Sequence, residues 1–229
     1  MADKKPIVVV AGATGRAGRL IVAELRKRKY PVRAMIIRPF DPPEPEGLTG
    51  SGIEIREGSL ESAEVLAGTL KGAGYVISAI GSTKPMSGSE FEKIDIAGNT
   101  ALARAAKAAG VKRFVVISSI GAGNSRDAMT CVFRLMMGQV IKAKSAMEEK
   151  IRETGVDYTI IRPGGYTARP LSGEIAISEG GKISGLVNRE LIAKVCVDAI
   201  ANAAMKNRTF EVVDRSALKK GREQFLIEV

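Results

Sequence analysis

The sequence predicts an α/β fold, a doubly wound parallel sheet covered by helices on both faces. Short apolar runs rich in β-branched residues alternate with helical patterns as far as residue 165. The first run, residues 7–10, has no polar face, which is typical of a strand buried on both sides of a parallel sheet. A glycine-rich turn leads from this strand into a helix with apolar residues along one side. This alternation is the pattern of strands joined by crossover helices.

Length and composition agree with a layered fold of this kind. The chain has 229 residues, of which 45% are hydrophobic, only 4% are aromatic and none is Trp. This composition predicts a large aliphatic core, which suits a parallel sheet covered by helices. We expect one domain over residues 1–229, with residues 167–208 contributing a small C-terminal substrate lobe.

Several classes of function are disfavoured by what the sequence lacks. It contains no His, and its two cysteines, Cys131 and Cys196, lie far apart, so neither a zinc site nor a histidine-based triad is expected. The charged N-terminus does not resemble a secretory signal, and no apolar run is long enough to span a bilayer. We therefore predict a cytoplasmic protein with no metal and no membrane span, either a monomer or a homodimer.

The charge of the chain is strongly positive. Lys and Arg outnumber Asp and Glu by 35 to 25, which gives a net charge of +10. One basic run, residues 26–29, closes the first helix and suits its C-terminal dipole. The other basic residues are scattered, with no recognition helix and no basic strand interleaved with aromatics, so nucleic acid is not expected as a partner. We predict instead an anionic cofactor and a small-molecule substrate.

The turn after the first strand carries glycines at a spacing of G-x-x-G-x-x-G. The first lets the chain leave the strand sharply, the second opens the backbone to a pyrophosphate, and the third allows close packing of the helix. Free N–H groups and the positive end of the helix dipole favour a phosphate here, although a turn without a ligand is the alternative. The predicted cofactor contacts in this turn are Gly12, Thr14, Gly15, Arg16, Ala17 and Gly18.

The end of the second strand bears on the choice between NAD and NADP. Residues 32–37 predict this strand, and Arg38 follows where NAD-binding proteins place a carboxylate against the ribose hydroxyls. An arginine there favours the 2′-phosphate of NADP, and Arg16 is close enough in the chain to reach the same phosphate. NADP(H) is therefore the predicted cofactor. A surface arginine without this role is the alternative for Arg38.

Three segments carry a resemblance to a known family. Residues 12–18, GATGRAG, resemble the glycine turn of the short-chain dehydrogenase/reductase superfamily, in its extended and atypical branches. Residues 157–165, DYTIIRPGG, resemble a segment of the atypical reductases, and Lys144 with Glu148 matches the active-site helix. The resemblance spans nearly the whole chain. It implies an NAD(P)-binding Rossmann domain similar to nitrogen-repressor-like (NmrA-like) and flavin- or biliverdin-reductase-like proteins.

The same resemblance implies cofactor contacts after the third and fourth predicted strands, residues 53–56 and 74–81. The family commonly has G-D-L after the third strand, with the acid near the adenine. A serine stands there in this chain, so we expect only a hydrogen bond to the base. Small residues at the end of the fourth strand let the cofactor pass close to the backbone, and a long helix is predicted over residues 91–109. The predicted contacts are Ser59, Leu60, Ala79, Ile80 and Gly81.

The fifth predicted strand, residues 114–118, ends at two serines. By topology this end lies beside the nicotinamide, where open α/β sheets place their chemistry. In the extended reductases the catalytic hydroxyl belongs to the second residue of such a pair, which implies that Ser119 hydrogen-bonds a substrate carbonyl. Ser118 is a predicted cofactor contact. A helix or turn cap is the alternative for both serines.

The superfamily's Tyr-x-x-x-Lys active site is incomplete in this chain. Lys144 and Glu148 match the extended pattern Y-x-x-x-K-x-x-x-E, but the tyrosine position holds Val140. The usual proton donor for reduction of a ketone is therefore missing. The resemblance implies that Lys144 holds the nicotinamide ribose, with Glu148 one turn further along to orient it. A surface ion pair is the alternative for these two residues.

The segment after the helix that carries Lys144 supplies the last predicted contacts. Tyr166 is expected to project toward the substrate and is one candidate for the missing proton donor; Tyr158 is another, although a core role suits its strand position better. Asn188 is expected to cap the next helix. The predicted contacts to the nicotinamide carboxamide are Pro163, Gly164 and Gly165.

Two functions follow from these patterns. The first is an NADPH-dependent oxidoreductase that transfers hydride to a small conjugated or aromatic acceptor such as a quinone, flavin, enone or carbonyl. Ser119, Lys144 and Tyr166 are its predicted catalytic residues. The alternative is a non-catalytic NADP(H)-binding sensor or assembly factor, which Val140 at the tyrosine position favours.

Overall fold

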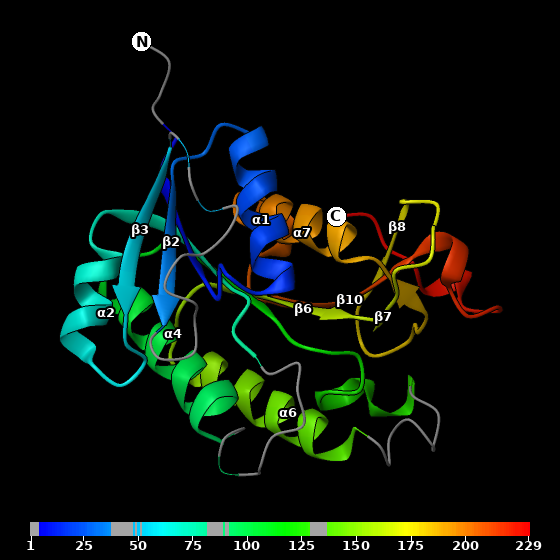
Figure 1. Cartoon of the computed structure of the whole chain (residues 1–229). Helices are drawn as coiled ribbons and strands as arrows, with labels where there is room; N and C mark the ends of the chain where they lie inside the picture. Colours follow the sequence, from blue (N-terminus) through cyan, green and yellow to red (C-terminus); the bar gives the residue numbers. More distant parts are fainter. Residues whose placement is uncertain are drawn as a thin grey trace.

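The computed structural model describes residues 5–37, 48, 50, 52–81, 89, 92–128 and 137–229. At its centre lies an eight-stranded sheet of order β3-β2-β1-β4-β5-β6-β10-β8 (Figure 1). Its strands are β1 (Ile7–Ala11), β2 (Val32–Ile37), β3 (Ile53–Gly58), β4 (Ala73–Ser78), β5 (Arg113–Ile117), β6 (Tyr158–Pro163), β8 (Ile175–Ser178) and β10 (Arg208–Asp214). Neighbouring strands pair in parallel from β3 to β10, and β8 is antiparallel to β10. The predicted doubly wound parallel sheet is confirmed.

Helices cover both faces of this sheet (Figure 1). On one face, α1 (Arg16–Lys27) packs against α7 (Arg189–Ala199). On the other face lie α2 (Ala63–Leu70), α4 (Asn99–Ala108) and α6 (Gly138–Glu153). The described chain also contains short 3-10 segments: η2 (Gly123–Ala128), η3 (Ala203–Met205), η4 (Arg215–Ala217) and η5 (Glu223–Phe225).

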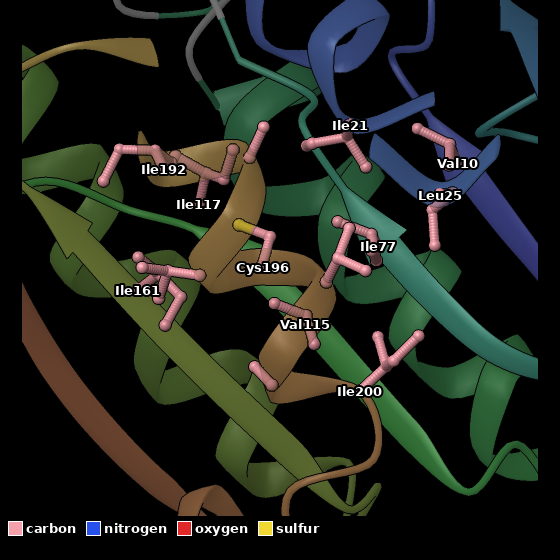
Figure 2. Packing of buried hydrophobic residues seen from close by; sticks show 14 of the residues in the cluster. Val10, Ile21, Leu25, Ile77, Val115, Ile117, Ile161, Ile192, Cys196 and Ile200 are labelled. Atoms are coloured by element: carbon pink, nitrogen blue, oxygen red, sulfur yellow. The ribbon is translucent and has the colours of Figure 1, made fainter. Parts of the chain in front are cut away.

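The alternation of side chains along β1 explains why this strand is apolar throughout. Val8 and Val10 pack in the cluster beneath α1 and α7, while Val9 and Ala11 pack in the cluster beneath α2, α4 and α6. Figure 2 shows the first cluster, in which Cys196 of α7 lies among aliphatic side chains. Burial raises the pKa of the Cys196 thiol to about 12, so this cysteine is a neutral packing residue.

The strand order places a topological switch point between β1 and β4. The chain winds outward from β1 to β3, returns to β4 on the other side of β1, and then winds outward in the opposite direction. Open α/β sheets bind ligands outside the carboxyl ends of the strands at such a point. The turn after β1 and the chain after β4 therefore border the expected ligand position.

Several predicted boundaries differ from the observed ones. The third strand continues to Gly58. The fourth strand, β4, ends at Ser78, and the next N–H, that of Ala79, donates to the Ala11 carbonyl. The helix predicted over residues 91–109 begins, in its described part, as a π-helix, η1 (Glu92–Gly98), and continues as α4. A π-helical turn has no distinct apolar period, and such turns are frequent at functional sites.

The chain after β6 forms a second, smaller sheet. Here β7 (Gly165–Tyr166) pairs in parallel with β9 (Leu186–Val187). Within residues 167–208, β8 extends the main sheet and α7 packs on α1. The small sheet directly follows the carboxyl end of β6, which places Tyr166 beside the edge that carries the expected ligand.

Candidate active site

The turn between β1 and α1 is held tightly by its glycines. Gly12 has a φ of +75°, and a Cβ there would lie 2.8 Å from the Ala79 carbonyl oxygen. A Cβ on Gly18 would lie 2.0 Å from the Gly12 carbonyl oxygen, so α1 approaches the turn this closely because Gly18 has no side chain. In this described segment no side chain caps α1, whose N-cap is Gly15, and its first turn contains no acid. The positive end of α1 is thus available to an anion.

Replacing Gly18 by Ala is expected to weaken binding of the predicted cofactor, NADPH, by at least about tenfold. The added Cβ forces the helix away from the turn, which should also lower the free energy of unfolding by roughly 1–3 kcal/mol. Gly68→Ala in α2 is the matched control, because its Cβ would meet nothing within 4 Å. Calorimetric titration and urea unfolding measure both effects. NADPH binding as tight in the Gly18 variant as in the Gly68 variant would contradict the role given to this turn.

The remaining predicted residues of the turn lie at the start of α1. The Arg19 guanidinium donates to the Thr14 carbonyl oxygen at 2.9 Å, which fixes the turn from outside. Arg16 is exposed and Ala17 is half-buried in the first turn of the helix. Arg38 lies outside the described residues, so its position relative to Arg16 stays a prediction.

Ser59 and Leu60 follow the carboxyl end of β3, on the same edge as the glycine turn. The Ser59 hydroxyl accepts a hydrogen bond of 3.2 Å from the Glu61 N–H. Leu60 packs against η1, where a Cβ on Gly98 would lie 2.6 Å from its Cδ1. Gly98 therefore permits a close contact between the chain after β3 and the π-helix.

Lys144 lies buried where the ends of β4 and β5 meet. Only 8% of the residue is exposed, and its Nζ donates to the Ile117 carbonyl oxygen at 3.3 Å. The same Nζ lies 2.7 Å from Oδ1 of Asp95, which is 1% exposed. A Cβ on Gly81 would lie 2.8 Å from Nζ, so the ammonium group reaches the backbone that was predicted to border the cofactor.

The partner that orients Lys144 is Asp95, and the prediction that Glu148 does so is wrong. Glu148 is fully buried and pairs elsewhere, so the alternative of a surface pair is also excluded. Asp95 belongs to the π-helix η1, which is tied to β4: Asn99 donates to the Asp95 carbonyl oxygen at 2.9 Å, and Ser78 donates to Asn99 Oδ1 at 2.6 Å. Two buried hydrogen bonds thus fix the turn that carries Asp95.

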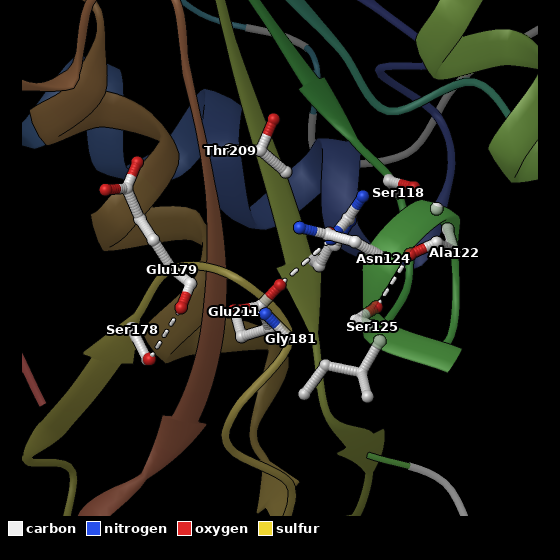
Figure 3. A network of polar contacts seen from close by, with 12 residues as sticks. Ser118, Ala122, Asn124, Ser125, Ser178, Glu179, Gly181, Thr209 and Glu211 are labelled. Carbon is white, nitrogen blue, oxygen red and sulfur yellow. Dashed lines mark hydrogen bonds and ion pairs between the residues drawn. The ribbon is translucent and has the colours of Figure 1, made fainter. Parts of the chain in front are cut away.

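Glu148 belongs to a second group, the buried charge cluster, which consists of Glu148, Arg162 and Glu211. The Arg162 guanidinium donates to Glu148 Oε1 at 2.9 Å and Oε2 at 2.7 Å, and to Glu211 Oε1 at 3.0 Å. It also donates to Asn124 Oδ1 at 2.6 Å. Figure 3 shows Asn124 and Glu211 converging from different segments, with the Gly181 N–H close to Glu211. The cluster joins α6, β6 and β10 at one point.

Electrostatics within the cluster follow from burial and pairing. Arg162 is 2% exposed, and both carboxylates are 0% exposed. Burial alone lowers the pKa of Arg162, but the hydrogen bonds and charge of Glu148, with those of Glu211, outweigh it and raise that pKa. Burial raises the pKa of Glu211, although the Gly181 N–H and Arg162 act against the shift. The guanidinium therefore stays charged, whereas burial disfavours the ionised form of the Glu211 carboxyl group.

The two predicted serines differ in their surroundings. Ser118 is buried, and its hydroxyl donates to Glu148 Oε1 at 2.6 Å, so the buried charge cluster fixes the end of β5. Ser119 is half-buried and donates to the adjacent Ile120 carbonyl oxygen at 3.0 Å. A hydroxyl bonded only to a neighbouring carbonyl can rotate toward a substrate oxygen, which the Ser118 hydroxyl cannot do without leaving a buried carboxylate short of a donor.

The chain from Pro163 to Tyr166 forms the far side of the site. A Cβ on Gly164 would lie 2.4 Å from the Gly185 carbonyl oxygen, and the Gly165 N–H donates to that oxygen at 3.0 Å. Tyr166 is 38% exposed, and the Arg189 guanidinium stacks 4.2 Å from its ring centre. Desolvation raises the pKa of the Tyr166 phenol, which keeps it protonated at neutral pH.

The expected cap of α7 is not formed as predicted. Asn188 occupies the N-cap position, but its side chain makes no cap hydrogen bond, and its Oδ1 is buried without a partner among the described residues. Tyr158, the other tyrosine considered, lies in β6 and stacks with Arg152, 5.9 Å from its ring centre. Its position at the amino end of β6 places it on the edge of the sheet opposite to Tyr166.

The chain is similar in sequence to one protein family and to several individual proteins. The family described as NAD(P)H-binding matches residues 12–203. An uncharacterised chloroplastic protein of Arabidopsis thaliana is 30% identical, over 96% of this chain and 80% of that protein. An NAD(P)H azoreductase of Xenophilus azovorans is 26% identical, over 93% and 69%. The photosystem II assembly factor Ycf39 of Guillardia theta is 31% identical, over 69% of this chain but only 46% of that protein.

Solved structures show the same fold. An oxidoreductase, ylbE, of Lactococcus lactis has a TM-score of 0.78 at 22% identity, over 92% of each chain. An anaerobillin reductase of Escherichia coli O157:H7 has a TM-score of 0.75 at 21% identity, over 91% of this chain and 97% of that one. Among the residues described here, no helix is both long and apolar enough to cross a membrane. The chain belongs to the NAD(P)H-binding family.

Proposed function

We propose that this protein is an NADPH-dependent reductase that transfers hydride to a small conjugated or aromatic acceptor, such as a quinone, flavin, enone or carbonyl compound. The observation that carries the proposal is the buried Lys144 ammonium, held by Asp95 directly beside Gly81. Asp95 offsets part of the desolvation cost of this buried charge, and the ammonium group is held where a cofactor that passes Gly81 could bind it. The azoreductase relative and the anaerobillin reductase fold neighbour support an acceptor with conjugated double bonds.

The residues fit a dinucleotide, because Gly12 and Gly18 let the turn pack closely against the start of α1, whose first turn contains no acid. The turn and the N-terminus of α1 would bind the pyrophosphate, and Lys144 would donate to the nicotinamide ribose hydroxyls. NADPH supplies the hydride when bound. Ser119 would donate a hydrogen bond to the acceptor, while the small sheet that carries Tyr166 would exclude water from one side. Pro163, Gly164 and Gly165 would contact the carboxamide through their backbone.

A two-electron reduction of an acceptor needs one proton besides the hydride. Val140 of α6 cannot supply it. Tyr166 follows the carboxyl end of β6 and is partly exposed, so it is the side chain proposed as donor for a carbonyl acceptor. A quinone or flavin takes its proton from water after the hydride arrives, and for these acceptors the missing active-site tyrosine is of little consequence.

Arg38→Glu is expected to weaken NADPH binding by about 100-fold and NADH binding by less than about threefold. The reason is that only NADPH carries the 2′-phosphate that Arg38 and Arg16 would neutralise. Calorimetric titration of both cofactors measures the effect, with Arg215→Glu, at an exposed arginine of η4, as the control for the same change of charge. Equal losses for the two cofactors would overturn the preference for NADPH.

The second candidate function is an NADP(H)-binding sensor or assembly factor without catalysis. Val140 at the tyrosine position favours it, and one relative is a photosystem II assembly factor. NADPH oxidation measured against quinones, flavins, enones, azo dyes and aldehydes, beside calorimetric titration of NADPH, separates the two functions. Turnover with any of these acceptors supports the reductase. Tight NADPH binding without turnover across the panel would overturn it in favour of the sensor.

A further inference from the structure

The basic run at the end of α1 lines a cavity that the proposed reductase does not use. This cavity, the basic pocket, has a volume of about 630 Å³, which is within the range of small-ligand sites. Four of the seven residues that line it are cations, and none is acidic. They are Lys5, Arg26, Lys27, Lys29, Tyr30, Pro31 and Gly52.

The basic pocket lies on the edge of the sheet opposite to the cofactor turn. It is lined by the chain that enters β1, by the C-terminal end of α1 and by the chain that enters β2. The glycine turn, by contrast, follows the carboxyl end of β1 and opens the N-terminus of α1. The 12 residues of α1 separate the two positions by about 18 Å. The phosphates of a dinucleotide at the glycine turn therefore do not account for these charges.

Three carboxylates of the described residues on neighbouring segments are paired with other arginines. Glu24 and Asp198 both bind Arg28, and Glu54 binds Arg33 and Arg56. Within the described ranges, neither Lys5 nor Lys27 nor Lys29 forms an ion pair. Lys5 instead donates to the Arg28 carbonyl oxygen at 2.7 Å and lies 4.3 Å from the Tyr30 ring centre, so its ammonium is held at the pocket. The mutual repulsion of these ammonium groups would be relieved by an anion.

Lys29 supplies an independent observation. It has a φ of +59°, the left-handed conformation that favours glycine. Its N–H donates to the Arg26 carbonyl oxygen at 2.8 Å, and the Tyr30 N–H donates to the Leu25 carbonyl oxygen at 3.0 Å, which is the Schellman motif. The position after the helix in this motif is usually Gly. Here the position is occupied by Lys29, which is one of the residues that line the basic pocket.

We propose that the basic pocket binds a phosphate-bearing anion, either a soluble polyphosphate compound or the head group of an anionic phospholipid. Lysines are compact point charges that suit phosphoryl oxygens of either source. The site is separate from the cofactor site, so both can be filled at once. Binding there would place the cofactor edge of the sheet away from the bound anion or membrane.

Titration calorimetry of sodium tripolyphosphate into protein saturated with NADP+ tests the proposal, because the cofactor then blocks the glycine turn. The test variant is Lys27→Ala with Lys29→Gly, and Lys220→Ala, at an exposed lysine of the C-terminal segment, is the control. We expect tripolyphosphate affinity to fall by at least about tenfold in the double variant and to stay unchanged in the control. Glycine relieves the strain at position 29, so the unfolding midpoint should be as high as in the wild type or higher.

Sedimentation with vesicles identifies the source of the anion. Vesicles of phosphatidylcholine with about 30% phosphatidylglycerol are compared with pure phosphatidylcholine. Binding to the anionic vesicles that the double variant loses identifies a phospholipid head group. Tripolyphosphate binding without vesicle binding identifies a soluble polyphosphate. Binding of neither, or equal binding by the wild type and the double variant, overturns the proposal.

Discussion

Methionine in place of Arg162 is expected to lower the free energy of unfolding by about 3–5 kcal/mol, as is typical when one partner of a buried ion pair is removed. The variant leaves Glu148 and Glu211, both 0% exposed, without the guanidinium that donates to each of them. Urea unfolding at neutral pH measures the loss. Methionine fills a similar volume, so the expected effect comes from the uncompensated charges rather than from a cavity.

Arg152→Met is the matched control for this prediction. Arg152 donates to the same Glu148 carboxylate at 3.2 Å, but its side chain is 36% exposed. Exposed ion pairs contribute little, so the control should lose less than about 1 kcal/mol. Equal small losses for both arginines would show that the buried charge cluster does not stabilise the fold through Arg162.

The pH dependence of the cluster has a definite sign. Burial raises the pKa of Glu211 in the folded state above its unfolded value, so the folded protein takes up this proton first as the pH falls. Ionised Glu211 therefore makes its largest unfavourable contribution above its folded pKa. That contribution is relieved as the pH falls through the folded pKa toward the unfolded one. The loss of unfolding free energy in the Arg162→Met variant should become smaller as the pH falls, because protonation of Glu211 removes an unpaired buried charge.

The buried charge cluster also contacts two elements that carry residues of the candidate active site, β5 and α6. Glu148 accepts from Ser118 at the end of β5 and lies one helical turn after Lys144 on α6. Loss of Arg162 would loosen the carboxylate that fixes both elements. Weaker NADPH binding should therefore accompany the loss of stability in Arg162→Met, but not in Arg152→Met.

The sheet and the glycine turn could be predicted because their signals are local. In β1, four consecutive apolar residues pack alternately into the core clusters on the two faces of the sheet. An unbroken apolar run is visible in the sequence without knowing which helices cover these faces. Helix α2 also has a local signal at its start, a serine at the N-cap position, where the Ser62 hydroxyl accepts from the Val65 N–H. Gly12 and Gly18 contact each other within one turn, so their spacing alone indicates the contact.

The pairing of Lys144 and the buried charge cluster could not be predicted in the same way. Asp95 lies 49 positions before Lys144, on a π-helix whose period differs from the one used to recognise helices. The nearest carboxylate in the helical register was Glu148, which the fold turns toward Arg162 instead. A signal for the cluster was present in the sequence: Arg162 and Glu211 each interrupt an apolar strand run, and charged residues at such positions need buried partners.

Methionine in place of Lys144 is expected to lower kcat for NADPH oxidation by at least about 100-fold, provided the reductase function holds. The ammonium group at this position would fix the nicotinamide ribose, and its loss lets the reacting carbon move. NADPH affinity should fall by only about tenfold, because the glycine turn and the phosphates bind elsewhere. Lys150→Met is the control on the same helix, since Lys150 is an exposed lysine paired with Glu153.

The Asp95→Asn variant keeps Lys144 but removes the carboxylate that positions its ammonium group. The amide keeps the shape of Asp95 but removes the charge that lies 2.7 Å from the Lys144 ammonium, so the ammonium is held less firmly beside Gly81. We expect kcat to fall by about tenfold, with NADPH affinity lowered by less than about threefold. The double variant Asp95→Asn with Lys144→Met is the control: if Asp95 acts through Lys144, its substitution should add no further loss of kcat to that of Lys144→Met. Additive losses in the double variant would show that Asp95 acts independently of Lys144, whereas full activity of Asp95→Asn would show that the position of Lys144 does not limit hydride transfer.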